Sequence, residues 1–251
     1  MASLAEITHY LDTYLAIHEF KDTCWNGLQI EGSPEVVLIA LSVDAGKEVF
    51  EQAHSLDAQL LITHHGHFWT TQSPTLTGWQ KDRLAPLLDH QISLYSAHLL
   101  LDRHSEVGNN IQLLNLLEAK PTQEFGAHDD GAISWIGECD ATTLEDIQAK
   151  LETKLDAALT VLPFGPKKIS RIAVMSGGGS YADVAEAISK KVDLYITGDT
   201  SEVYHLAKDA SLNVVFAGHY ATETLGIVAL GDKLAEKFDV QTAFVDLPTG
   251  L

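Results

Sequence analysis

The chain has 251 residues, 45% of them hydrophobic, which is enough to bury a substantial core in one large or two small domains. Its 16 basic and 35 acidic residues give a formal net charge of −19, which argues against nucleic acid or an acidic membrane as a partner. Its two cysteines, Cys24 and Cys139, lie far apart, which excludes a disulfide framework and a cysteine zinc site and fits a reducing compartment.

The first segment predicts a helix. Ser3 and Glu6 form a capping-box pattern ahead of Ile7, Leu11 and Leu15, which follow helical spacing. The segment lacks the basic leader and continuous apolar core of a signal peptide, and no run approaches the roughly 18 apolar residues of a membrane span. We therefore expect a cytoplasmic protein with no membrane partner.

Apolar runs separated by helical patterns indicate an α/β fold. Strands are expected at 36–43, 59–63, 92–95, 132–137, 171–175, 194–197 and 213–216, and helices at 83–88, 181–192 and from 222 onward. The polar stretch 123–131 is the predicted boundary between an N-terminal α/β domain, 1–125, and a C-terminal one, 126–251.

Two consecutive histidines, His64 and His65, close the predicted strand 59–63. Neighbouring side chains on a strand point to opposite sides, so the pair can serve two different centres. Hydrogen-bonded histidines of no further function are the alternative interpretation. Two metal ions would explain the adjacency better than one.

Other candidate ligands also follow predicted strands. Asp102 comes after the strand 92–95, and His219 and Glu223 come after the strand 213–216. Open α/β sheets bind ligands at the carboxyl ends of their strands, so these groups are expected to converge. We expect Thr222 to cap a helix, with Glu223 in its first turn and His219 on the preceding loop.

Imidazoles and carboxylates together suit zinc, iron, manganese or nickel. Five ligands for two ions require sharing, and a carboxylate can bridge metals about 3.5 to 4 Å apart. Glu223 is the predicted bridge, because it is the carboxylate paired locally with a histidine.

A glycine-rich turn, Gly177–Gly179, follows the predicted strand 171–175 and precedes a helix. With Asp199 past the next strand, it fits a dinucleotide-binding fingerprint, in which Asp199 would hold a ribose hydroxyl. The interpretation we favour is a tight strand-to-helix turn, with Ser180 as the cap of the helix.

The chain resembles the Nif-three-like dinuclear metal-centre proteins, known in bacteria as GTP cyclohydrolase I type 2 homologues. The matching stretches run in order along nearly the whole chain and form a highly specific set: 25–29 (WNGLQ), 63–69 (THHGHFW), 98–102 (HLLLD), 108–110 (GNN), 196–199 (ITGD) and 218–223 (GHYATE).

This resemblance implies two interlocked α/β domains with mixed sheets and a toroidal homohexamer. It also implies two divalent metal ions per chain, carried by His64, His65, Asp102, His219 and Glu223, with Glu223 on both ions.

The activity that the resemblance implies is metal-dependent hydrolysis of a small molecule of the nucleotide class. For a GTP cyclohydrolase, water would attack the purine C8 and formate would be released. His98 and His67 are the candidates for a general acid or base, and His205 is at most a residue that supports a ligand. A non-enzymatic metal-storage or metal-delivery protein would use the same ligands, so it remains an alternative.

Overall fold

The computed structural model describes residues 1–250, and the chain divides into two compact α/β units. Unit 1 comprises Met1–Leu101 and Ile227–Leu247, and unit 2 comprises Asp102–Gly226 with the residues from Pro248 on. The boundary therefore falls after residue 101 and not after residue 125. The stretch 123–131 is no linker, because it belongs to the antiparallel pair of β7 (Lys120–His128) and β8 (Gly131–Thr143).

Unit 1 is built around a five-stranded sheet with the order β13-β4-β5-β6-β2. Its strands β13, β4, β5 and β6 are parallel, and β2 is antiparallel to β6. The elements of this unit in chain order are β1 (Ala2–Ser3), α1 (Leu4–Tyr14), β2 (Gly27–Ile30), β3 (Glu35–Val36), β4 (Leu38–Asp44), α2 (Lys47–Ser55), β5 (Leu60–His65), α3 (Trp79–Asp89), β6 (Ser93–Ser96), the start of α4 (Leu99–Asp102), the end of α9 (His219–Phe238) and β13 (Gln241–Phe244).

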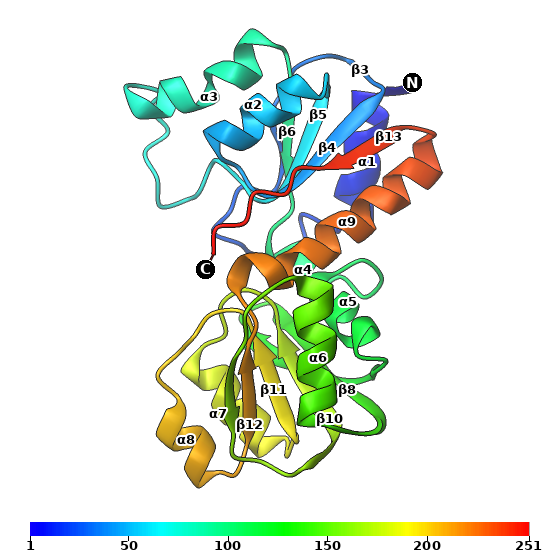
Figure 1. Ribbon diagram of the computed structural model, residues 1–251. Helices are drawn as coiled ribbons and strands as arrows, with labels where there is room; N and C mark the ends of the chain where they lie inside the picture. The colour runs from blue at the N-terminus through cyan, green and yellow to red at the C-terminus, as the bar shows by residue number, and fades with distance from the viewer. Residues whose placement is uncertain (251) are drawn as a thin grey trace. The chain divides into compact units, whose positions relative to one another are not determined.

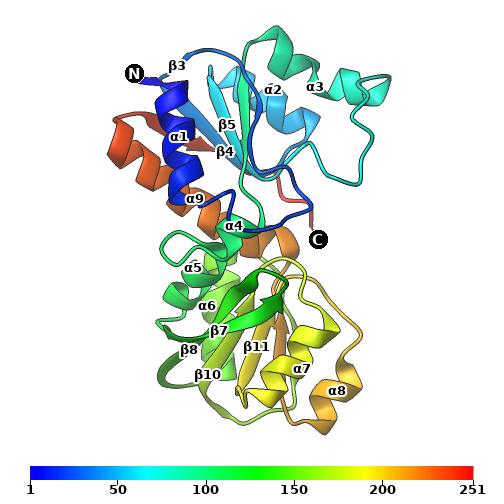
Figure 2. The same ribbon diagram turned by 180° about the vertical axis from the view of Figure 1, so that it is seen from behind.

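Alternate residues of the unit 1 strands face different helices. Ala40, Leu61 and Leu94, which are paired across the sheet, pack in a core cluster with residues of α2 and α3. On the other face, the Tyr95 hydroxyl donates to Asp12 of α1 at 2.9 Å. Figures 1 and 2 show α2 and α3 on one side of this sheet and α1 on the other. Burial of both faces explains why these strands read as continuous apolar runs.

Helix α1 forms as predicted, but without the capping box. Ser3 is its N-cap residue and its side chain makes no capping hydrogen bond. The reason is that Ser3 also belongs to β1, where it pairs with Glu35, and the Leu4 N–H bonds to the Pro34 carbonyl. The strand pairing therefore satisfies one of the free N–H groups at the start of the helix, although a different one from the N–H that a Ser3 side-chain cap would bind.

Unit 2 contains a six-stranded mixed sheet with the order β7-β8-β10-β11-β12-β9, in which β10, β11 and β12 are parallel. Its other elements are α5 (Asn109–Leu116), α6 (Leu144–Leu155), β9 (Thr160–Pro163), β10 (Lys168–Met175), α7 (Tyr181–Ser189), β11 (Leu194–Thr197), α8 (Tyr204–Asp209), β12 (Asn213–Phe216) and the start of α9. The predicted α/β class with mixed sheets is confirmed.

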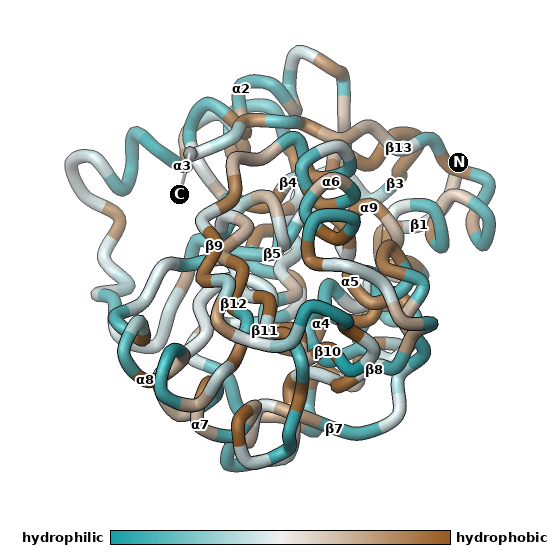
Figure 3. Tube along the Cα trace, turned by 60° about the horizontal axis from the view of Figure 1, so that its bottom comes forward, coloured by the Kyte–Doolittle hydropathy of each residue, from teal (hydrophilic) through white to brown (hydrophobic). Residues whose placement is uncertain are grey.

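Helices cover both faces of the unit 2 sheet. Val174, Ile196 and Val215 pack with α5 and α6, whereas Ala173, Tyr195 and Val214 pack with α7 and α8. Figures 1 and 2 show these helix pairs on opposite sides of the sheet, and Figure 3 shows the hydrophobic character of β11 and β12. These two strands begin and end at the predicted residues.

The chain leaves unit 1 at Leu101 and returns to it at Ile227, within α9. Unit 1 is therefore built from both ends of the chain. Along residues 1–250, none of the helices has the length and apolar character needed to cross a membrane.

Candidate metal centre

In unit 1 the parallel strands β4, β5 and β6 end at one edge of the sheet. Asp44 ends β4, His64 and His65 end β5, and His98 follows β6 by two residues. The carboxyl ends of neighbouring parallel strands therefore bring these side chains together.

His64, His65 and His98 form a compact imidazole cluster. One ring nitrogen from each lies within 4.8 Å of the others, a spacing that suits a metal ion. The ring centroids of His64 and His65 are 4.7 Å apart, so the two rings do not diverge to opposite sides as expected. They occupy the last two positions of β5, where the alternation of a strand no longer holds the side chains apart.

The second ring nitrogen of each of these two histidines already has a partner. Nδ1 of His64 lies 2.9 Å from the carbonyl oxygen of Ala97, and Nδ1 of His65 lies 2.8 Å from Oδ1 of Asp44. Both acceptors favour the tautomer with the proton on Nδ1 and the lone pair on Nε2. Metal-ligating histidines are oriented in this way by carbonyl and carboxylate partners.

His98 has the same arrangement. Its Nδ1 lies 2.9 Å from Oδ1 of Asp22, whose side chain is almost fully buried, and its backbone N–H donates to Asn26 at 2.7 Å. Burial disfavours the charged Asp22 carboxylate, but its hydrogen bonds with His98 and Asn26 outweigh burial and hold the pKa of Asp22 well below its usual value. A permanently ionised Asp22 fixes the orientation of the His98 ring.

His67 does not belong to this cluster. Its ring packs edge-on against Phe68 with centroids 4.7 Å apart, and its Nδ1 is buried with no hydrogen-bond partner among residues 1–250. Burial, and then the charge of Arg83, lower the pKa of His67 to about 4. A pKa this far below neutral pH makes His67 a weak base near pH 7, which counts against it as a proton-transfer group.

In unit 2, His219 and Glu223 lie one turn apart on α9, with Nε2 of His219 3.2 Å from Oε1 of Glu223. The helix begins at His219, so His219 is not on a loop and Thr222 is no cap. Nδ1 of His219 lies 3.0 Å from Oδ1 of Asp199. The hydrogen bonds with Glu223 and Asp199 raise the pKa of His219 to about 9 against the effect of burial. The raised pKa means that His219 carries a proton on Nε2 as well as on Nδ1 near pH 7, and a metal ion bound at Nε2 would displace the Nε2 proton.

The glycine-rich turn forms the surface against which Glu223 and His219 pack. Gly177 has φ +62°, and a Cβ at this position would overlap Oε1 of Glu223 and lie 3.0 Å from Nε2 of His219. The Gly177 N–H donates to Oγ1 of Thr222 at 2.9 Å. Glycine is thus required here both for its backbone conformation and for space.

Two of the three glycine amides of this turn, and the amide of Ser180 that follows, are used within the protein. The Gly179 N–H donates to Thr197, the Ser180 N–H donates to Asp183, and the Ser180 side chain accepts from Asp183 in a capping box. Asp199, the candidate ribose ligand, is engaged by His219. These contacts favour the tight-turn interpretation of Gly177–Gly179 over a phosphate-binding loop.

Asp102 is the last residue of α4 and is 5% exposed. Its Oδ1 accepts hydrogen bonds from Nδ2 of Asn109 at 2.9 Å and from Oγ of Ser176 at 2.8 Å. The Asn109 side chain in turn accepts from the Gly226 N–H on α9. Two neutral donors therefore hold a buried carboxylate in one orientation, as is typical of a ligating carboxylate.

Sequence reasoning missed most of the residues that support these ligands. Asp44 directly follows the predicted strand 36–43, so the rule that identified His64 would also have identified it. Ser176 directly follows the predicted strand 171–175, so the same rule would have identified it too. Asp22 carries no such signal, because only the folded chain shows that it contacts His98. The sequence predicts a different role for Asp199, that of holding a ribose hydroxyl, whereas the structure places it against His219.

The fold and these donor groups define a two-unit α/β protein with candidate metal ligands in each unit. The sequence profile of the Duf34/NIF3 (NGG1p interacting factor 3) family matches residues 2–249. The chain therefore belongs to the Duf34/NIF3 family, which confirms the resemblance read from the sequence.

Relatives named GTP cyclohydrolase 1 type 2 homolog are similar over the full length. The one from Pyrococcus horikoshii is 46% identical over 249 residues, covering 98% of each chain, and the one from Archaeoglobus fulgidus is 40% identical over 251 residues, covering 99% of this chain and 100% of that protein. Among solved structures, protein ybgI, of unknown function, has a TM-score of 0.92 at 33% identity, and TTHA1606 from Thermus thermophilus has 0.89 at 34%, each covering 100% of both chains.

Proposed function

We propose that this protein binds two divalent metal ions through His64, His65, Asp102, His219 and Glu223 and uses them to hydrolyse a small molecule. Unit 1 supplies the two strand-end histidines, and unit 2 supplies the two carboxylates and the third histidine. Glu223 is the proposed ligand of both ions. The mixed nitrogen and oxygen donors suit zinc, iron, manganese or nickel.

One observation carries this proposal. In His64, His65 and His219, Nδ1 faces a carbonyl or carboxylate oxygen at 2.8 to 3.0 Å. This leaves Nε2 as the nitrogen that can bind metal. This arrangement is the usual support of metal-bound imidazole, and it fixes the orientation of the ring and raises its basicity.

Bound metal ions would lower the pKa of a water and polarise the group that it attacks. The chain's own contribution is to orient the ligands and to supply a proton-transfer group. His98 is the proposed general acid or base, because its ring lies 5.1 Å from that of His64 and 5.5 Å from that of His65 and is held by Asp22. The names of the relatives point to a nucleotide such as GTP as the substrate.

The test begins with metal analysis of protein purified without an affinity tag that carries metal. The same material is then assayed for hydrolysis of GTP and other nucleotides, with and without a chelator. We expect close to two metal ions per chain and activity that the chelator abolishes. A protein with no bound transition metal at neutral pH would contradict the proposal.

A metal-storage or metal-delivery protein would use the same ligands but would exchange its metal without turnover. Transfer of the bound metal to a competing chelator within minutes, together with no hydrolysis across the nucleotide panel, would favour that role over an enzyme. The two functions are thus separated by exchange rate and turnover and not by metal content.

We also propose that the chain assembles as a homohexamer. This follows from its resemblance to the family, whose members are expected to form toroids. Six chains of 27.3 kDa would give about 164 kDa. Light scattering at micromolar concentration measures this mass, and a value of one or two chains would refute the assembly.

A further inference from the structure

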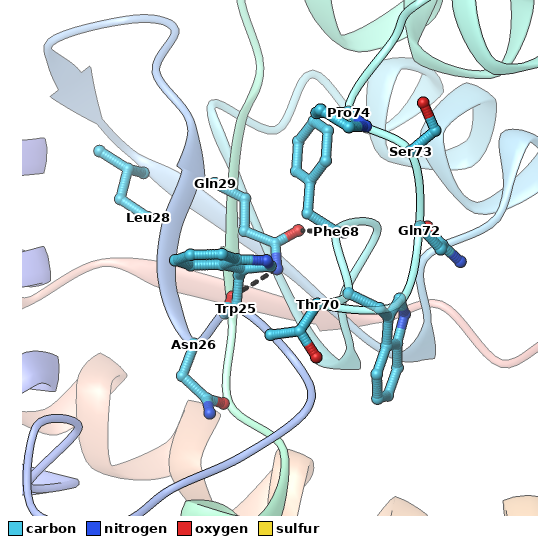
Figure 4. Close-up of a pocket in the computed structure, with 10 residues that line it drawn as sticks. Trp25, Asn26, Leu28, Gln29, Phe68, Thr70, Gln72, Ser73 and Pro74 are labelled. Carbon is cyan, nitrogen blue, oxygen red and sulfur yellow. Dashed lines mark hydrogen bonds between the residues drawn. The ribbon is translucent and has the colours of Figure 1, made fainter.

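Unit 1 contains a cavity of about 540 Å³ that the ligand set does not use. It lies between the segment that leads into β2 and the loop that follows β5, and Figure 4 shows the side chains of both segments around it. Trp25 comes from the first segment, and Phe68 and Trp69 come from the second. The volume is within the range of pockets that hold small organic molecules, about 300 to 1,000 Å³.

The two walls of the cavity are fixed to each other. The Trp25 N–H donates to the Phe68 carbonyl at 3.0 Å, and Cys24 forms an isolated bridge with Trp69. The Gln29 side chain spans the gap, because its Oε1 accepts from the Phe68 N–H and its Nε2 donates to the Trp25 carbonyl (Figure 4). The pocket is therefore preformed, which reduces the entropic cost of binding.

Not all aromatic side chains of the pocket are buried against other residues. Trp25 is 61% exposed, which is unusual for so large an apolar side chain. The Trp69 indole is held in place by its N–H, which donates to the Gly66 carbonyl at 2.9 Å. A flat ligand would cover the exposed indole face and gain both apolar burial and ring stacking.

Trp69 connects the pocket to the histidine cluster. Its ring lies 5.0 Å from that of His98 and 6.3 Å from that of His65, and it also lines the cavity. The cavity therefore borders the histidine cluster through the Trp69 ring, which is the one residue of the lining with a ring contact to His65 and His98 among those described.

None of the ten residues lining the cavity is charged. A charged group placed there would meet no ionic partner in the lining, so the cavity favours an uncharged ligand. The polar groups of the lining are amides and hydroxyls, such as those of Thr70 and Gln72, which suit the nitrogen and oxygen atoms at the edge of a heterocycle.

We propose that this cavity binds an uncharged, planar heteroaromatic ring stacked on Trp25, with the edge of the ring toward Trp69, whose own ring contacts those of His65 and His98. The binding of the ring does not require metal. Its role as the part of the substrate that is held beside the ions rests on the proposed function.

Calorimetric titration of the purified, metal-analysed protein tests this inference with four probes. Adenosine and nicotinamide carry flat heteroaromatic rings, cyclohexanecarboxamide carries the nicotinamide amide on a saturated ring, and ribose is the sugar of adenosine alone. We expect binding of at least one flat probe and at least tenfold weaker binding of its saturated or ringless counterpart. No binding of either flat probe at millimolar concentration, or equal binding of both counterparts, would overturn the proposal.

Trp25→Ala should weaken binding of the flat probe by about 5- to 150-fold, the range expected when one stacking partner is removed. Trp25→Phe, which keeps an aromatic face, should retain most of the affinity. The matched control is Trp79→Ala, because Trp79 is 64% exposed in the same unit and does not line the cavity. Equal affinity in the Trp25 and Trp79 alanine variants would contradict a stacking role for Trp25.

Metal content, measured on each variant, separates this proposal from the proposed function. We expect Trp25→Ala to keep the metal of the unaltered protein. Full metal loading without ring binding would overturn the cavity proposal alone, whereas ring binding by a protein that holds no metal would overturn the proposed function alone.

Discussion

The two units position their candidate metal ligands in different ways. In unit 1 the donors are imidazoles on consecutive residues of one strand, His64 and His65, each backed by an oxygen acceptor. In unit 2 the carboxylates of Asp102 and Glu223 lie on separate helices and depend on neighbouring amides, hydroxyls and a glycine turn. Unit 1 therefore places its donors by local strand geometry, and unit 2 places its donors by tertiary packing.

The largest effect is expected from Glu223→Ala. If Glu223 contacts both ions, its loss leaves each ion short of a ligand, and most of the bound metal should be lost. Metal analysis by mass spectrometry measures this change. Glu236→Ala is the control, because Glu236 is exposed on the same helix. Retention of both ions by Glu223→Ala would contradict a bridging role.

His65→Ala tests the imidazole half of the comparison. His65 is a proposed ligand, so its loss should lower metal content and any metal-dependent hydrolysis together, while circular dichroism shows an unchanged fold. His205 provides the contrast, because it lies exposed on α8 with its ring 5.3 Å from that of Tyr204. His205→Ala should keep most of the metal, with about a 100-fold reduction in affinity as the upper limit. Equal and complete metal loss in both variants would show that the ligand set is wrong.

Gly177→Ala tests whether the carboxylate half depends on packing. The new methyl group would displace Glu223 and His219, and the positive φ adds about 1 kcal/mol or more of backbone strain. We expect reduced metal content in a folded protein. Gly46→Ala serves as the comparison, because Gly46 has φ −115° and a Cβ there would meet its nearest neighbour at 4.0 Å. Unchanged metal content in Gly177→Ala would mean that Glu223 is not held by this turn.

The smallest effects are expected from Asp44→Asn and Asp199→Asn, which alter the residues behind His65 and His219. Each removes a negative charge but keeps a hydrogen-bonding side chain, so metal affinity should fall by about 10- to 100-fold without complete loss. Competition with a metallochromic indicator measures both affinities. Affinities equal to that of the unaltered protein would show that these carboxylates do not support the ligands.

The sequence identified the strands that matter most for the site. The apolar runs 194–197 and 213–216 are β11 and β12 residue for residue, since strands buried on both faces have no polar interruptions. The sequence pattern did not predict β2 and β9, because these strands are short and only partly apolar. The polar stretch 123–131 was predicted to be a domain boundary, but it is part of a β-hairpin. Polar composition marks solvent exposure, which a hairpin and a linker share.

The sequence by itself determined the α/β class, the family and the candidate ligands, because strand periodicity and ordered motifs are local properties of the chain. Only the tertiary structure revealed that Asp44, Ala97 and Asp199 orient the three histidines and that Gly177 makes room for Glu223. It also revealed the cavity beside Trp25. These features join residues that are 20 or more positions apart, and their contacts depend on side-chain packing that no local pattern encodes.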